Sequence, residues 1–287
     1  MSLDDRLRAN LTENLHAEHF ADEIRIVGGM DDCPETERVL DAFRNVPREA
    51  FAGPGPWSTR SVFYDMALRK TPDADPRWLY HCVLVVLDEK LGINIGEPSF
   101  WARILARTCI RSDSRILQVG AGVGYYTAIL DQLAGQGGKI TAYEVDDALV
   151  KRARENLQSL SNVGIQQGNA AIELEENGPF DLIISFAGAT HIPAKWISQL
   201  TPNGRILLPM TGINGWGAMV LARMQDQSLT GKTLGRCAFY PCAGARNDMQ
   251  AKRLDELLYT RAQCDRAQVN FSEFSLGAHI ESVMPEA

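Results

Sequence analysis

The chain has 287 residues, 45% of them hydrophobic and 23% charged, a composition typical of a soluble globular protein. Its length suits one large domain or one domain with appended segments. The formal net charge of −7 disfavours general nucleic-acid binding, because an acidic surface repels phosphates. The charged N-terminal residues contain no apolar secretory signal, and no apolar run reaches the roughly 18 residues of a membrane helix. We therefore predict a cytoplasmic protein that does not bind membranes.

The histidines and cysteines show no metal-binding pattern. None of the six cysteines forms a C-x-x-C pair, and the five histidines are scattered along the chain. We therefore predict no metal site, and thiols that are buried or idle. None of these features sets the oligomeric state.

The N-terminal residues predict two helices. Leucines recur every four residues from Leu3 to Leu15 with charged residues between them, which is typical of an amphipathic helix. Gly28 and Gly29 interrupt this pattern. Pro34 then stands where a second helix would begin, because proline is favoured in the first helical turn.

The next stretch is rich in proline. Five prolines fall within residues 44–80, which predicts that no helix or strand runs long there. The apolar run Leu79–Leu87 fits either a short strand or a buried helix, since its periodicity does not distinguish them. Pro98 opens a predicted helix over Ser99–Cys109.

Apolar strands alternate with amphipathic helices from residue 115 onward. The predicted strands cover residues 115–119, 139–143, 163–167, 181–186 and 205–208; the predicted helices cover residues 125–133, 146–160 and 194–200; and a turn is predicted at Pro202–Gly204. This alternation predicts an α/β fold: a doubly wound, mostly parallel sheet with helices on both faces. Residues 218–224 and 236–240 predict an antiparallel strand pair, and residues 248–264 a helix in a mostly polar C-terminal segment.

The first strand runs into a glycine-rich turn, Gly120–Gly124, that precedes a helix. Glycines there tolerate unusual φ values and let a ligand approach the backbone. A dinucleotide site would place its third glycine at position 125, where this chain has Tyr125. The turn therefore favours a ligand without phosphates, such as an aminoacyl sulfonium, and disfavours a dinucleotide-dependent oxidoreductase.

Two side chains at later strand ends suit an adenosine-containing ligand. Glu144 ends the second strand, where a carboxylate can accept hydrogen bonds from both ribose hydroxyls. Asn169 follows the third strand, where its amide can meet the adenine ring. The alternatives are a plain strand–helix turn with a solvated acid at Glu144, and an ordinary Asx turn at Asn169.

These segments together resemble a known family. ILQVGAGVGYYTAIL, AYEVD, QGNAA, FDLIISFAGATHIP and LTPNGRILLPM occur in the order seen in class I S-adenosylmethionine-dependent methyltransferases. Over about residues 35–246 the chain more narrowly resembles the protein-L-isoaspartate O-methyltransferase family. The resemblance implies an enzyme with S-adenosyl-L-methionine as cofactor and S-adenosyl-L-homocysteine as product.

The resemblance also implies a division of the chain and a set of cofactor contacts. Residues 1–111 would form a helical and irregular segment on the substrate side, residues 112–245 the cofactor-binding core, and residues 246–287 a C-terminal extension. The implied cofactor-binding residues are Glu97, Gln118, Gly120, Ala121, Gly122, Gly124, Tyr125, Thr127, Glu144, Val145, Asn169 and Ala170.

The substrate segment departs from the family pattern. Where the family has T-I-S-Q-P, this chain has Asn94–Pro98, so Gly96 replaces the serine associated with isoaspartate repair. Two catalytic candidates follow: Glu97, beside the methyl site, and His191, a base at the ligand edge of the sheet. The alternative for His191 is a loop histidine that contacts nothing reactive. A buried charge on Glu97 would repel a carboxylate acceptor.

Three functions remain. The favoured one is a methyltransferase that acts on a small-molecule or peptide acceptor, because the substrate segment is altered. The second is a genuine isoaspartyl carboxyl methyltransferase. The third is a non-catalytic S-adenosylmethionine-binding sensor or partner protein.

Overall fold

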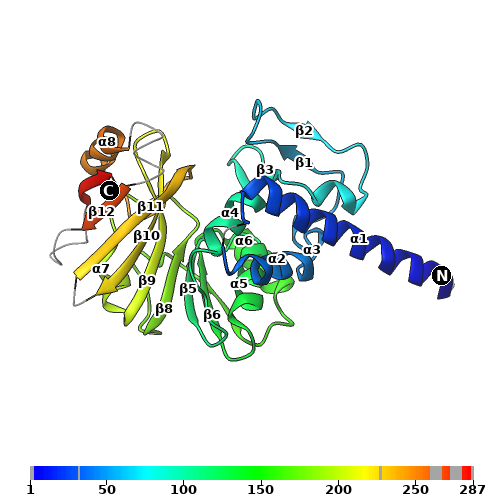
Figure 1. Cartoon of the computed structure of the whole chain (residues 1–287), viewed down its shortest axis with the longest axis horizontal. Coiled ribbons are helices and arrows are strands. Elements are labelled where there is room, and N and C mark those ends of the chain that lie inside the picture. Colours follow the sequence, from blue (N-terminus) through cyan, green and yellow to red (C-terminus); the bar gives the residue numbers. More distant parts are fainter. Residues whose placement is uncertain (1–2, 32, 226–227, 259–266, 272–279, 286–287) are drawn as a thin grey trace. The chain divides into compact units, whose positions relative to one another are not determined.

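The computed structural model describes residues 3–31, 33–225, 228–258, 267–271 and 280–285 (Figure 1). The chain forms two compact units. The first comprises Met1–Cys109, Gly122–Leu133 and Glu155–Ser159; the second comprises Ile110–Ala121, Ala134–Arg154 and Leu160–Ala287. No helix in the described part is long and apolar enough to cross a membrane. The division predicted from the sequence, at residues 111/112 and 245/246, stays a prediction.

Helices make up much of the first unit. They are α1 (Leu3–Gly28), α2 (Thr36–Asn45), α3 (Glu49–Ala52), α4 (Pro98–Leu105) and most of α5 (Tyr125–Ala134). The helices predicted near Leu3, Pro34 and Pro98 are therefore present. Their apolar faces meet in a core where Phe20, Ile24, Leu40 and Phe43 are fully buried, which is the main source of stability for amphipathic helices.

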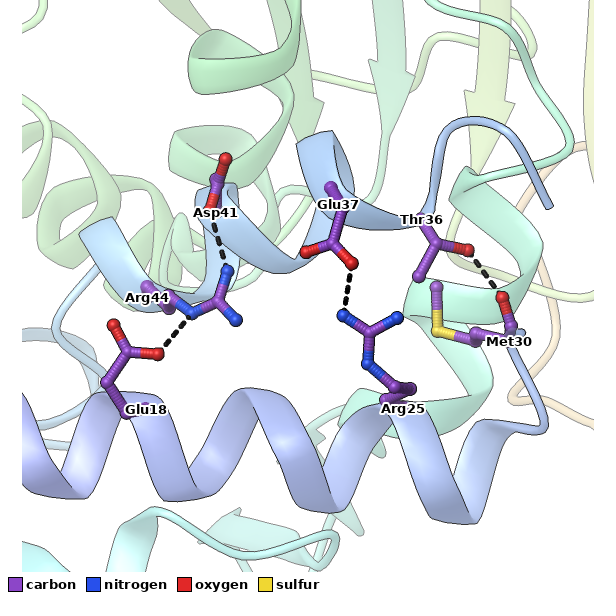
Figure 2. A network of polar contacts seen from close by, with 7 residues as sticks. All are labelled: Glu18, Arg25, Met30, Thr36, Glu37, Asp41 and Arg44. Carbon is purple, nitrogen blue, oxygen red and sulfur yellow. Dashed lines mark hydrogen bonds and ion pairs between the residues drawn. The ribbon is translucent and has the colours of Figure 1, made fainter. Parts of the chain in front are cut away.

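Polar contacts join α1 to α2 along the rim of this core (Figure 2). Arg25 pairs with Glu37, and the Arg44 Nε donates to Glu18 at 2.9 Å. The Thr36 hydroxyl donates to the carbonyl of Met30 at 2.6 Å, which fixes the turn between the helices. The acids of both ion pairs are exposed, so we expect the pairs to orient the helices more than to stabilise them.

The first unit also contains a small antiparallel sheet that the sequence analysis did not predict. Its strands are β1 (Ser58–Arg60), β2 (Arg69–Lys70), β3 (Leu84–Asp88) and β4 (Ile93–Ile95), in the order β2-β1-β3-β4, and a 3-10 helix covers Pro76–Leu79. The regular elements within residues 44–80 are short, as predicted: α3 and the 3-10 helix span four residues each, and the strands β1 and β2 span three and two. These strands are so short that they fit between the prolines, which lie in the connections where no ladder N–H is needed. The second half of the ambiguous run Leu79–Leu87 lies in the strand β3, and no part of the run is an α-helix.

The second unit is built on one nine-stranded sheet with the order β13-β12-β11-β10-β9-β8-β5-β6-β7. The parallel strands are β5 (Arg115–Val119), β6 (Lys139–Glu144), β7 (Val163–Gln167), β8 (Phe180–Ser185) and β9 (Leu200–Thr211). From β5 the chain adds β6 and β7 on one side and then returns to add β8 and β9 on the other. The connections between these strands contain α5, α6 (Asp147–Asn156) and α7 (Ala194–Ser198). The doubly wound α/β class is confirmed, and the direction of winding reverses between β5 and β8.

The antiparallel half extends further than predicted. It consists of β10 (Trp216–Gln225), β11 (Ser228–Ala238), β12 (Ala267–Phe271) and β13 (Ile280–Pro285). The predicted pairing of β10 with β11 is confirmed, but β11 begins earlier because its polar first half pairs with β10 and β12. The helix α8 (Asp248–Leu257) is present, and the predicted remainder after residue 258 lies outside the described residues.

The predicted turn at Pro202–Gly204 lies inside β9. The register of β9 against β8 shifts there, from Phe180 opposite Leu200 to Leu182 opposite Arg205. Between these two pairs β9 has more residues than β8. A β-bulge accommodates such additional residues without ending the pairing of the two strands.

Candidate functional site

The carboxyl ends of β5 and β8 meet at the start of the glycine loop. The Phe186 amide donates to the carbonyl of Val119 at 2.8 Å. The amides of Gly120 and Ala121 both donate to the carbonyl of Tyr143, at 2.9 and 3.0 Å, and so tie the loop to β6. Gly120 has φ +84°, a conformation that favours glycine. The first two loop amides are therefore used to position the loop at the edge where open α/β sheets bind ligands.

Gln118 has an unpartnered polar atom at the ligand edge. Its side chain is fully buried near the end of β5, and among the described residues its Oε1 has no hydrogen-bond partner. The Nε2 makes one long contact, 3.5 Å, to the carbonyl of Gly120. An unpartnered buried amide oxygen costs about 1–3 kcal/mol, so a ligand that donates to it recovers that free energy. An ammonium group is one such donor.

Glu144 is held rigidly at the end of β6. Its side chain is buried, and its Oε1 accepts hydrogen bonds from the amides of Val145 and Asp146, at 2.8 and 3.1 Å. Asp146 caps α6 by accepting from the Leu149 amide at 2.9 Å. The Gly168 amide donates to the carbonyl of Glu144 at 2.9 Å and brings the end of β7 alongside. A carboxylate oriented this way suits hydroxyl donors such as a ribose diol.

Asn169 forms the Asx turn that the sequence analysis gave as the alternative. Its Oδ1 accepts from the Ala171 amide at 3.0 Å. Its Nδ2 lies 3.1 Å from where a Cβ on Gly244 would be, so the amide group faces the loop after β11. Ala170 is buried, and its carbonyl accepts from the Trp196 indole at 2.9 Å. The turn thus takes one hydrogen bond of the amide oxygen, and the amide nitrogen is a donor near the loop after β11.

His191 lies in the segment after β8. Its Nδ1 is 3.2 Å from the hydroxyl oxygen of Thr190. That hydroxyl oxygen also accepts from the Asn247 amide at 2.9 Å, at the start of α8. The imidazole orientation is therefore coupled to two segments of the second unit.

Five predicted site residues belong to the first unit: Glu97, Gly122, Gly124, Tyr125 and Thr127. Gly122 and Gly124 have φ values of +57° and +92°, and a Cβ at Gly124 would meet Leu157 Cδ1 at 2.6 Å. The Tyr125 ring packs among aromatic side chains of the same unit, and the hydroxyls of Tyr125 and Thr127 are buried. Tyr125 therefore contributes packing to the first unit through its ring.

Glu97 caps α4. Its Oε1 accepts from the amide of Ser99 at 3.0 Å, and its Oε2 accepts from the amide of Phe100 at 2.6 Å. The Ser99 hydroxyl also lies 3.0 and 2.9 Å from the two oxygens. A carboxylate at a helix N-terminus satisfies orphan amides and interacts favourably with the helix dipole. This local role explains why an acid follows Gly96.

The space beside Gly96 is filled by Trp101, which the sequence analysis missed. A Cβ at position 96 would lie 2.6 Å from the Trp101 Nε1 and 2.8 Å from its Cδ1. The indole is buried, and the Tyr126 hydroxyl donates to the carbonyl of Gly96 at 2.8 Å. No sequence signal links a glycine with a tryptophan five positions later, because their contact depends on how the chain enters α4.

A model of the protein-L-isoaspartate(D-aspartate) O-methyltransferase family matches residues 30–247. The chain belongs to this family. Curated relatives named protein-L-isoaspartate O-methyltransferase include one from Brucella anthropi, 29% identical over 210 residues, which cover 72% of this chain and 86% of the relative. Another, from Roseiflexus sp., is 31% identical over 212 residues, which cover 72% of this chain and 84% of the relative.

Solved structures agree on the fold of this family member. A protein-L-isoaspartate O-methyltransferase matches with a TM-score of 0.65 and 17% identity over 93% of this chain and 88% of that one. A putative one from Plasmodium falciparum, solved with S-adenosyl-L-homocysteine, matches with a TM-score of 0.59 and 20% identity over 80% of this chain and 98% of that one. The chain is an S-adenosylmethionine-dependent methyltransferase, and the comparisons do not distinguish between acceptors.

Proposed function

We propose that this methyltransferase acts on a small-molecule or peptide acceptor other than an L-isoaspartyl residue. The observation that carries the proposal is the closed space beside Gly96. The family resemblance places there a serine associated with isoaspartate repair, whereas here the Trp101 indole fills the volume that any side chain would need. A genuine isoaspartyl carboxyl methyltransferase is the second candidate, and family membership favours it.

We propose that the second unit holds the cofactor through three polar groups. The Gln118 Oε1 accepts from the amino group, the Glu144 carboxylate accepts from the ribose hydroxyls, and the Asn169 Nδ2 donates to the adenine. Val145 and Ala170 flank these groups, and the Gly120–Ala121 backbone shapes the turn. The contacts predicted for Glu97, Gly122, Gly124, Tyr125 and Thr127 stay predictions.

S-adenosylmethionine supplies a methyl group activated by a sulfonium. The contribution of the chain is to align the acceptor with that methyl and to exclude water. A carboxylate acceptor is already ionised at neutral pH, whereas a hydroxyl or an ammonium must lose a proton. We propose that His191, oriented by Thr190, takes that proton if the acceptor is a hydroxyl or an amine.

The cofactor assignment is tested by calorimetric titration with S-adenosylhomocysteine. We expect Glu144→Ala to weaken binding by about 100-fold, because hydrogen bonds to a charged acceptor contribute about 1.5–3 kcal/mol each. The matched control is Asp146→Ala, which removes the cap of α6 and leaves the proposed ribose acceptor in place. Equal affinities for the Glu144 variant and the wild type would refute the role of this carboxylate.

The acceptor assignment is tested with labelled S-adenosylmethionine and a synthetic isoaspartyl peptide. We expect no methyl transfer to the peptide by an enzyme that binds S-adenosylhomocysteine normally. Stoichiometric labelling of the isoaspartyl carboxyl would overturn the proposal and establish the second candidate instead.

A further inference from the structure

The loop of residues 61–68, between β1 and β2, exposes an unusual number of large apolar side chains. Tyr64 is 85% exposed and Phe63 60% exposed, and Val62, Met66 and Leu68 are also exposed. Single exposed apolar residues are common, but a contiguous run of aromatic and aliphatic groups is typical of an interaction site. We call residues 61–68 the β1–β2 loop.

The β1–β2 loop is held in a defined conformation. Both carboxylate oxygens of Asp65 accept from the Arg69 guanidinium, at 2.9 and 2.8 Å, and Asp65 also accepts from the Ala67 amide at 2.9 Å. The Arg60 guanidinium donates to the carbonyl of Met66 at 3.4 Å. Such internal contacts lower the conformational entropy that the loop loses on binding, so the exposed groups are preorganised for a partner.

The loop and its flanking strands carry positive charge in an otherwise acidic chain. Residues 58–70 contain three cations, Arg60, Arg69 and Lys70, and one anion, Asp65, which gives a formal charge of +2 against −7 for the whole chain. Asp65 is paired with Arg69, so Arg60 and Lys70 determine the sign of the patch. Complementary charge speeds encounter and selects partners, which favours an acidic one.

We propose that the β1–β2 loop docks an acidic, apolar segment of a polypeptide acceptor. The apolar side chains of that segment pack on Phe63, Tyr64 and Met66, while its carboxylates lie near Arg60 and Lys70. β2 is at the edge of the small sheet, a position at which an extended peptide can add as a strand. The proposal rests on the proposed function, which allows a small-molecule or a peptide acceptor, and it selects the peptide.

The charges disfavour other occupants of this surface. A second copy that met the loop through a two-fold axis would bring together two patches of the same positive sign. Recognition of an anionic membrane takes clusters of about four to eight basic residues, more than this patch contains. Nucleic-acid affinity likewise depends on many phosphate contacts, which two unneutralised cations do not supply.

The test is selection from a displayed library of random twelve-residue peptides on three immobilised proteins: wild type, the double variant Phe63→Ser/Tyr64→Ser, and Leu91→Ser. Leu91 is the matched control, because it is 62% exposed in the turn between β3 and β4. We expect wild type and Leu91→Ser to retain a common set of peptides, rich in Asp, Glu and large apolar residues. In separate titrations with members of this set, the double variant should bind about 30-fold more weakly, the effect of losing an interface hot spot, and a further variant, Lys70→Glu, should also bind more weakly.

Three results would overturn the proposal. One is a selection in which the wild type retains no peptides that the double variant does not also retain. Another is a set of retained peptides that is basic or uncharged. The third is that the wild type dimerises or binds phosphatidylserine vesicles, and that the double variant loses this property while its peptide binding is unchanged. Titration with S-adenosylhomocysteine is run on every variant and should be unchanged, so failure of the docking proposal is distinguished from failure of the methyltransferase proposal.

Discussion

Two regions differ in whether their buried polar groups have hydrogen-bond partners. One is the ligand edge of the second unit, where the strands β5, β6 and β7 end; the other is the Gly96 segment of the first unit, Asn94–Pro98. At the ligand edge, Gln118 keeps a buried oxygen unpartnered among the described residues. In the Gly96 segment the Glu97 carboxylate accepts from Ser99 and Phe100, and the carbonyl of Gly96 accepts from a tyrosine hydroxyl. An unsatisfied buried acceptor can be satisfied by a ligand or by water, whereas internally satisfied groups contribute shape. Among the described residues, the ligand edge therefore offers an unpaired polar acceptor, whereas the Gly96 segment contributes shape.

The largest effect expected in the first unit comes from Arg48, which is fully buried. Its guanidinium donates to the carbonyls of Leu79, His81 and Val83 at 2.7–2.9 Å and so fixes the segment that leads into β3. Arg48→Met leaves these carbonyls without their donors, and we expect a loss of about 3 kcal/mol or more in the free energy of unfolding. Urea denaturation measures it.

Arg44→Met is the control for Arg48→Met, because the Arg44 guanidinium pairs with the exposed acids Glu18 and Asp41. We expect this variant to lose less than about 1 kcal/mol. Equal losses in the two variants would contradict the role given to the buried guanidinium.

A smaller effect is expected for Gly96→Ser. The new Cβ would overlap the Trp101 indole, so we expect destabilisation by about 1–3 kcal/mol, the usual range for overpacking. In a double-mutant cycle, Gly96→Ser should cost less when Trp101→Leu is already present. Gly164→Ser in β7 is the control, since a Cβ there would meet only the carbonyl oxygen of Ile140 at 4.0 Å. Additive losses in the cycle would show that the indole is not what excludes a side chain.

The features of the second unit that the sequence predicts are those with causes local in the chain. The strand, glycine turn and Glu144 follow one another within about 30 residues, and each has a local cause: strand periodicity, positive φ at Gly120, and a strand that ends in an acid. The fold class and the placement of the ligand edge were accessible for this reason. The cofactor contacts at this edge are still predictions.

The parts that were missed depend on contacts distant in the chain. β1 and β2 are too short to show a pattern, and they exist because β1 pairs with β3 more than 20 residues later. The polar first half of β11 is a strand only because it has β10 beside it. Trp101 matters because Gly96 leaves room for it. Tertiary pairing decides such elements, and local propensity does not report it.

The smallest effect is expected at the exposed pair Asp65–Arg69 of the β1–β2 loop. Hydrogen bonds from the Arg69 side chain, helped by the Ala67 amide, lower the pKa of Asp65 to about 2. A lowered pKa means that the pair stabilises the fold fully above the ordinary value of 3.8 and loses that contribution as the pH falls toward 2. Arg69→Met should return the pKa of Asp65 toward 3.8, as measured by carboxyl-carbon NMR titration that extends from pH 6 to below the wild-type pKa.

Asp131 in α5 is the internal control for this titration, because burial raises its pKa and no arginine is involved. Its titration should be the same in both proteins. A wild-type Asp65 that titrates at its ordinary value would show that Arg69 does not hold the loop in solution. The β1–β2 loop would then have to order on binding, and the peptide affinities expected from a preorganised surface would fall accordingly.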